Sequence, residues 1–176
     1  MKTIKAAFII AALATILCSA KAGAMEASLD SRNFREFAIN VYRIPTDCSA
    51  YVKRDATVTH IQEYVTGRLG EFASIDYSAD TPFLSLQVDC MKLEDTRGEG
   101  RVIGYTVSML LQFYRPFFED VTYVHASPWY KTLLIYIPHE TFTQADFEEQ
   151  LDTLLDQFCT QWLDEHKAVS DTDNQR

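Results

Sequence analysis

One stretch of the sequence constrains the fold more than any other: residues 101–118, reading RVIGYTVSMLLQFYRPFF. Apolar side chains recur there at every second position, at Ile103, Tyr105, Val107, Met109, Leu111 and Phe113. Because side chains alternate between the two faces of a strand, this spacing predicts a long strand with one buried face. Strands usually have about five or six residues, so this one is expected to be the centre of a sheet.

The first 24 residues have the pattern of a secretory signal peptide. Lys2 and Lys5 precede an apolar run at 6–17, and small residues at 19–24 offer cleavage sites, the best after Ala22 or Ala24. An apolar run of this length is too short to cross a bilayer. We therefore expect export, with the mature protein in the periplasm or secreted.

Cys18 raises the question of a lipid anchor. Lipoprotein signals place small residues just before the modified cysteine, whereas Ile16 and Leu17 occupy those positions here. Cys18 is therefore expected to be discarded with the signal peptide, and no lipid anchor is expected. No other apolar segment approaches the length of a membrane span.

The charge balance limits the kinds of partner. The chain has 16 lysine and arginine residues against 25 acidic ones, for a net charge of −9. Nucleic acids and anionic lipid headgroups would repel such a surface. Neither is an expected partner.

Two strands and a helix are predicted before the central strand. Residues 36–44 alternate as a strand that ends before Pro45, and residues 83–94 alternate again. Residues 54–72 have apolar positions three and four apart, which predicts an amphipathic helix. The segments 74–82 and 95–100 are predicted to be loops, the second closing a hairpin.

The central strand is followed by a predicted turn at 115–120 and more strand. Strand character resumes at 121–126 and 129–137, with a bulge or break predicted at Ser127 and Pro128. Thr143 and Asp146 have the spacing of a helix capping box. They begin a helix at 143–167 with an apolar stripe of Phe147, Leu151, Leu154, Leu155, Phe158 and Trp162.

The predicted order of elements is therefore βαβββα. It favours an α+β two-layer sandwich, with a mostly antiparallel sheet and both helices on one face. A right-handed crossover would make the first two strands parallel, and it allows them to be adjacent in the sheet. The expected organisation is a signal peptide at 1–24, a flexible lead-in at 25–35, one domain at 36–168 and a disordered tail at 169–176.

This layout resembles small βαβββα domains of the Gram-negative envelope. Examples are the amino-terminal domain of the Tol-system propeller protein and the lipopolysaccharide-assembly lipoproteins. The resemblance rests on the order of elements, the long hairpin of 83–94 with 101–118, and the closing helix. It implies a scaffold or adaptor rather than a catalyst, and it carries no site residues over.

Three cysteines remain after signal removal. If the first two strands are parallel neighbours, Cys48 and Cys90 lie at the same end of the sheet, and we expect them to form a disulfide. Cys159 lies at the edge of an apolar helix stripe and is expected to fill core space. The histidine and cysteine spacings match no metal site, so neither a metal nor a cofactor is expected.

No enzymatic motif stands out in the sequence. A thiol enzyme pairing Cys159 with His125 or His139 would need a proximity that sequence does not show. The closely spaced carboxylates lie mostly on one helix face, which is typical of a solvated surface. The chain is therefore not expected to be an enzyme.

Aromatic residues crowd the last strands and their connection. Tyr114, Phe117, Phe118, Trp129 and Tyr130, with Arg115 at the rim, are the candidate partner-binding residues. The alternative is that these aromatic rings cap one end of the sandwich or pack against Trp162. The sequence alone does not distinguish the two.

The leading functional hypothesis is a soluble, non-enzymatic binding or adaptor module. It would present a sheet edge or the aromatic turn to another envelope or secreted protein, or to a second copy of itself. One alternative is a carrier of a small apolar ligand between sheet and helices, near Tyr105, Met109 and Phe113. Another is an inhibitor of a secreted hydrolase that uses the same turn as a plug.

Overall fold

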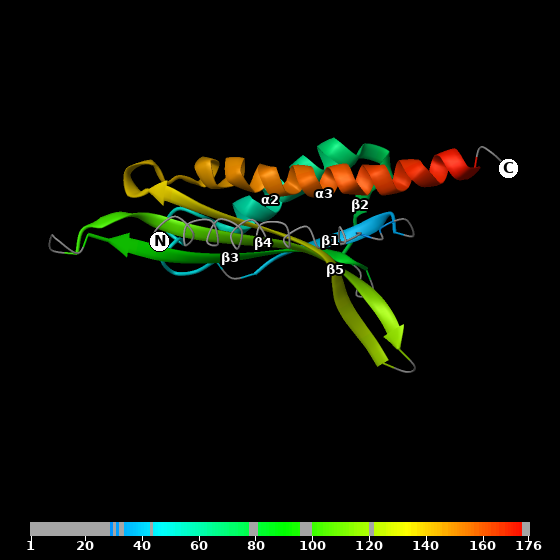
Figure 1. Cartoon of the computed structure of the whole chain (residues 1–176), viewed down its shortest axis with the longest axis horizontal. Helices are drawn as coiled ribbons and strands as arrows, with labels where there is room; N and C mark the ends of the chain where they lie inside the picture. The colour runs from blue at the N-terminus through cyan, green and yellow to red at the C-terminus, as the bar shows by residue number, and fades with distance from the viewer. Residues whose placement is uncertain are drawn as a thin grey trace, which may run out of the picture.

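The computed structural model describes residues 29, 31, 34–42, 44–77, 81–95, 100–119 and 122–173, with backbone alone at 117–119, 122–125 and 168–173. The protein is α+β, and its major elements follow the predicted βαβββα order (Figure 1). The strands are β1 (Glu36–Val41), β2 (Ser74–Ile75), β3 (Phe83–Glu94), β4 (Val102–Glu119) and β5 (Thr122–Pro138). The helices are α2 (Arg54–Leu69) and α3 (Gln144–Asp173), with the short 3-10 turns η2 (Gly70–Phe72) and η3 (His139–Thr141).

The five strands form one mixed sheet in the order β2-β1-β3-β4-β5. β1 pairs parallel with β3, as predicted, and β3, β4 and β5 pair antiparallel. β4 is the long central strand expected from the period-two pattern. The two-residue β2 lies in a predicted loop, because two residues are too few to show an alternating pattern.

Both helices lie on the same side of the sheet in Figure 1. The sheet positions that face them are buried, and they include the predicted inward phase of β4 from Tyr105 to Phe113. Phe37, Phe113, Phe158 and Trp162 form an aromatic cluster between sheet and helix, with ring centroids 5.0 to 6.2 Å apart. Removing such side chains from water is worth about 1.5–3 kcal/mol each, so this layer is the main source of stability.

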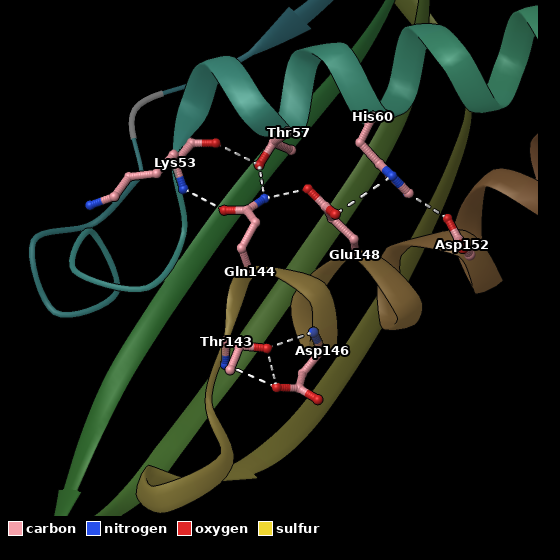
Figure 2. A network of polar contacts seen from close by, with 8 residues as sticks. All are labelled: Lys53, Thr57, His60, Thr143, Gln144, Asp146, Glu148 and Asp152. Carbon is pink, nitrogen blue, oxygen red and sulfur yellow. Dashed lines mark hydrogen bonds and ion pairs between the residues drawn. The ribbon is translucent and has the colours of Figure 1, made fainter.

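The Gln144 side chain joins the beginnings of the two helices (Figure 2). Its amide oxygen accepts a hydrogen bond from the Lys53 backbone N–H at 2.7 Å. Its amide nitrogen donates to Glu148 at 2.6 Å and to the Thr57 hydroxyl at 3.2 Å. Lys53 precedes α2, whose first N–H groups have no partner within the helix, so one side chain of α3 serves the end of α2.

His60 makes a second cross-link between the helices, one turn further along α2 (Figure 2). Its Nε2 lies 2.7 Å from an Asp152 carboxylate oxygen, and its Nδ1 lies 3.7 Å from Glu148. All three groups are partly exposed, so this contact orients the helices more than it stabilises them.

The predicted capping box at the start of α3 is confirmed. The Thr143 backbone N–H donates to the Asp146 carboxylate at 3.0 Å, and the Asp146 N–H donates to the Thr143 hydroxyl at 3.2 Å (Figure 2). The helix then continues to Asp173, so residues 169–173, expected in a disordered tail, are helical. Residues 174–176 lie outside the described residues.

The predicted turn at 115–120 is wrong. β4 continues to Glu119 and pairs with β5 through this region, including Pro116 with His125. β3 begins at Phe83, opposite Tyr114, so among the described residues 116–119 of β4 pair with β5 alone. A proline is tolerated in such a two-stranded segment, because a position whose N–H would point away from β5 loses no ladder hydrogen bond.

The β4–β5 hairpin leaves the sheet as an arm. The predicted irregularity at Ser127 and Pro128 is confirmed, since the pairing shifts register between Phe113 with Trp129 and Arg115 with Ala126. Figure 1 shows that beyond this shift the hairpin bends away from the side that carries the helices. A bulge of this kind increases the local twist and bends a strand, which accounts for the change of direction.

The predicted flexible lead-in is held in place where the structure describes it. Leu29 is buried in the core, and the Ser31 backbone N–H and hydroxyl both donate to one oxygen of Glu165, at 2.7 and 2.8 Å. The Phe34 carbonyl oxygen lies 2.9 Å from His166 Nε2. Residues 1–28, including the predicted signal peptide and Cys18, lie outside the described residues.

Candidate binding surface

The predicted disulfide between Cys48 and Cys90 is present. It ties the segment after β1 to the later part of β3, with the two Cα atoms 6.1 Å apart. The parallel pairing of β1 and β3 brings these positions to one end of the sheet, which is the arrangement from which the disulfide was predicted. The bond is a structural cross-link between these two segments.

Cys159 is the free cysteine among the described residues, and it is fully buried. Burial raises the pKa of its thiol to about 12, so the nucleophilic thiolate is absent at neutral pH. His139, one of its two proposed partners, lies 3.3 Å from the Tyr51 hydroxyl instead. The side chain of His125, the other, lies outside the described residues. The thiol-enzyme hypothesis therefore loses its nucleophile.

Trp129 is not on the surface, contrary to its place among the candidate partner-binding residues. Its ring is completely buried against Phe158, with centroids 5.6 Å apart. The indole N–H donates to Gln161 on α3 at 2.8 Å. Trp129 faces Phe113 across the last pair before the register shift, on the inward phase of β5. It anchors the base of the arm to the core, as the alternative interpretation of these aromatic residues holds.

Tyr114 lies on the opposite side of the sheet from the helices. It pairs with Phe83, and the two rings stack at 4.8 Å with an interplanar angle of 14°. The Tyr114 hydroxyl donates to Gln112 at 3.1 Å. Arg115 is half-buried one residue later, where the arm begins. Both residues therefore mark the junction between sheet and arm.

Phe117 and Phe118 lie in the arm itself, where the structure describes the backbone only. They pair with Val124 and Tyr123 respectively. They are part of a strand rather than of a turn, and their side chains lie outside the described residues.

Tyr130 belongs to a broad surface that we call the open face, the outward-pointing residues of β3, β4 and β5. By the pairing register it comprises Phe83, Ser85, Gln87, Asp89, Met91 and Leu93; Gly104, Thr106, Ser108, Leu110, Gln112 and Tyr114; and Tyr130, Thr132, Leu134, Tyr136 and Pro138. Ser85 is on this side of the sheet but is itself buried. Four large apolar side chains of this set are strongly exposed: Leu134 at 70%, Tyr130 at 59%, Met91 at 58% and Tyr136 at 55%.

The open face carries almost no charge. Asp89 is its one ionised side chain, in a chain with a net charge of −9. Acidic side chains lie instead along α3, among them Glu149, Asp156 and Asp164, which are exposed. Aromatic and small hydroxyl or amide side chains without charge are the composition of protein-binding surfaces, where charged residues are depleted at the centre.

Gly104 is required on this face because Tyr136 covers it. The Tyr136 hydroxyl donates to the Ile103 carbonyl oxygen at 3.0 Å, which lays the ring across the β4 backbone. A Cβ atom at Gly104 would lie within 2.4 to 2.7 Å of the ring atoms and the hydroxyl. The exposed ring is thus held flat on the sheet instead of being free to rotate.

The sequence-based candidates included Tyr114 and Tyr130 but missed Met91, Leu134 and Tyr136. These three residues are on the outward side of their strands, and they alternate with inward residues that were assigned to the core. The available signal was that several outward positions of these strands carry large apolar side chains, where polar ones would be expected. Only the strand register shows that they belong to one surface.

Side chains pack closely around the residues proposed to line an apolar ligand site between sheet and helices. Met109 and Phe113 are completely buried and Tyr105 nearly so. The three described hollows lie at the periphery, and none of them is lined by these residues. This packing does not favour a carrier of an apolar ligand.

The described residues contain no group of histidine, cysteine and acidic side chains placed to hold a metal ion. None of their helices is both long enough and apolar enough to cross a membrane.

Comparisons with known proteins do not assign this chain to a family. No family model and no curated protein matches the sequence. A crystal structure of the rare lipoprotein B from Shewanella oneidensis matches with a TM-score of 0.33 and 14% identity, over 80% of this chain and 99% of that one. The match is to a lipoprotein, like one of the two examples that the order of elements resembles. Because the TM-score is low, it assigns neither a family nor a function to this chain.

Proposed function

We propose that this protein is an exported, non-enzymatic binding module that contacts another protein through the open face and the adjoining arm. The observation that carries the proposal is the concentration of exposed Tyr130, Leu134 and Tyr136 on a face with one charged side chain. Exposed apolar patches on soluble domains mark interaction sites, since leaving them in water is unfavourable. The partner is another envelope or secreted protein, and the site of action is the periplasm or the medium.

Three features of this surface suit recognition. Tyr136 and Tyr114 are already held by hydrogen bonds to Ile103 and Gln112, so binding would cost little additional side-chain ordering. Antiparallel strands give the face a rigid backbone. The arm bends toward the side of the open face, so a partner could contact both surfaces at once (Figure 1).

Site-specific photo-crosslinking in the producing cells tests the proposal. A photoreactive residue at Tyr130 should give one discrete protein adduct, and a second probe at position 117 tests the arm. The matched control is Gln157, an exposed position of α3 on the helix side. Placing a carboxylate on the open face with Met91→Glu should reduce the Tyr130 adduct at least about fivefold without changing folding, because interfaces reject an unpaired charge.

The possible results separate cleanly. An adduct from Tyr130 that Met91→Glu removes and that Gln157 does not give supports the proposal, and its mass identifies the partner. An adduct between two copies of the chain identifies a homodimer as the bound form. Adducts that are equal at Tyr130 and Gln157, or no adduct at either open-face or arm positions, would contradict the proposal.

A further inference from the structure

β5 is an edge strand whose outer side has no partner in the described chain. It comes last in the sheet order, and its pairing is with β4 alone. In an antiparallel pair, residues alternate between those bonded to the neighbour and those whose N–H and C=O groups point away. About half of the β5 backbone groups therefore point toward the free edge, ready to pair with another strand.

The middle of this edge lacks the usual protection. Natural edge strands are guarded by charged residues, prolines, bulges or short length. β5 has Pro128 and Lys131 before its final stretch and Pro138 at the end, but residues 132–137, reading TLLIYI, contain no charge, glycine or proline. A run with such high β-propensity at a free edge would aggregate unless something else covered it.

A hollow of about 330 Å³ runs along this part of the edge. It is lined by four consecutive β5 residues, Ile135 to Pro138, and across from them by Thr141, Asp146, Glu149 and Gln150. Consecutive strand residues point to opposite faces, so a hollow that touches all four must lie beside the strand rather than above it. Strand edge and helix thus form the two walls of a groove.

The helix wall of this groove is acidic. Asp146 and Glu149 both line it, although one oxygen of Asp146 is already bonded within the capping box at Thr143. Lys131, the basic residue of β5, lies four residues before Ile135, about 13 Å along the strand. The groove therefore presents backbone donors and acceptors on one side and negative charge on the other.

We propose that the groove binds an extended basic segment of a partner protein, which adds to the sheet as a strand beside β5. Backbone hydrogen bonds to residues 132–137 supply affinity, and a lysine or arginine of the added strand faces Asp146 and Glu149. This inference rests on the proposed role as a binding module, but it concerns the strand edge rather than the open face.

The probe is a nine-residue synthetic peptide in which lysine or threonine alternates with valine. Titrated against the purified protein, it should bind with an affinity that weakens as salt is added. A counterpart with glutamate in place of lysine should bind at least about tenfold more weakly, a difference of about 1.4 kcal/mol. A lysine peptide N-methylated at three consecutive central residues should not bind, because neither of its edges can then donate hydrogen bonds.

Two matched variants locate the site. Glu149→Gln removes one charge from the groove and should weaken the lysine peptide about threefold to tenfold. Glu63→Gln makes the same change on the exposed side of α2, away from the groove, and should leave binding unchanged. Peptide binding should also slow amide hydrogen exchange within residues 132–137.

Met91→Glu separates this inference from the proposed function. It alters the open face two strands away from the edge, so it should leave peptide binding unchanged while it removes the Tyr130 adduct. Strand addition is overturned if the lysine and glutamate peptides bind equally, if neither binds at about 1 mM, or if exchange slows only outside 132–137. Any of these results leaves the open-face experiment as a separate test.

Discussion

Cys159 and Tyr136 show how single residues depend on their surroundings for their roles. The thiol of Cys159 is chemically reactive in water, but here it lies inside the helix–sheet interface. Tyr136 is a common core residue, but here it lies flat on the outside of the sheet above Gly104. Burial makes the Cys159 thiol unreactive, and a hydrogen bond to the Ile103 carbonyl oxygen fixes the Tyr136 ring.

We expect the Cys159 thiol to resist alkylation in the folded protein. Its raised pKa and lack of exposure remove both the thiolate and the access that a reagent needs. Iodoacetamide at pH 7.5 should label it only after denaturation, as measured by intact mass. Rapid labelling of the native protein would contradict the burial and revive a catalytic role for this cysteine.

Gly104→Ala and Gly67→Ala should have opposite effects on stability. The new Cβ at Gly104 would displace the Tyr136 ring and cost about 1 kcal/mol, since an exposed ring can move aside. Nothing lies within 4 Å of a Cβ at Gly67, in the last turn of α2, so alanine there should add about 0.5–1 kcal/mol. Urea unfolding midpoints measure both changes, and equal shifts would show that Tyr136 does not cover Gly104 in solution.

At the scale of elements, the two ends of β5 behave differently. Its first residues, 122–126, pair with β4 in the arm, and the register shift at Ser127 and Pro128 separates them from the rest of β5. Its last part forms the free edge beside the beginning of α3. The position of that helix end therefore defines the groove, and the capping box at Thr143 determines where the helix begins.

Thr143→Ala should destabilise the protein by about 1 kcal/mol. The variant loses the hydroxyl that accepts a hydrogen bond from the Asp146 N–H, and the first turn of α3 is left without its cap. Thr153→Ala, at an exposed position within the same helix, is the matched control and should be neutral or slightly stabilising. A thermal or urea unfolding curve that is unchanged for Thr143→Ala would contradict the role of the cap.

The whole molecule divides into two unlike sides. One is the helical layer, which bears much of the exposed acidity, and the other is the nearly uncharged open face. Like charges keep copies of the helical side apart, whereas the open face offers no such repulsion. This separation leaves the chain one surface on which its net negative charge does not oppose contact.

Removing the Cys48–Cys90 disulfide should destabilise the whole domain. The bond closes a loop with a sequence separation of 42, worth about 4 kcal/mol through restriction of the unfolded chain. A variant with alanine at both positions should unfold at a correspondingly lower urea concentration. Reductant should lower the stability of the native protein and leave that variant unchanged, and an effect on the variant would point to another cause.

The sequence by itself determined the elements whose signals are local. Period-two alternation identified β3 and β4, three- and four-residue spacing identified α2 and α3, and the Thr143–Asp146 pair placed a helix start. The disulfide followed from one further step, the parallel pairing of β1 with β3. These features depend on side chains a few residues apart, or on a connection rule that applies to most sheets.

Only the tertiary structure decided which surface is open. The strand register put Trp129 inside and Tyr130 outside, and it joined Met91, Leu134 and Tyr136 into one face. The described part of β4 beyond the first residue of β3 pairs with β5 alone, which allowed Pro116 to lie in a strand where the sequence indicated a turn. Pairing between distant strands sets both outcomes, because burial and free edges arise only when segments far apart in the chain meet.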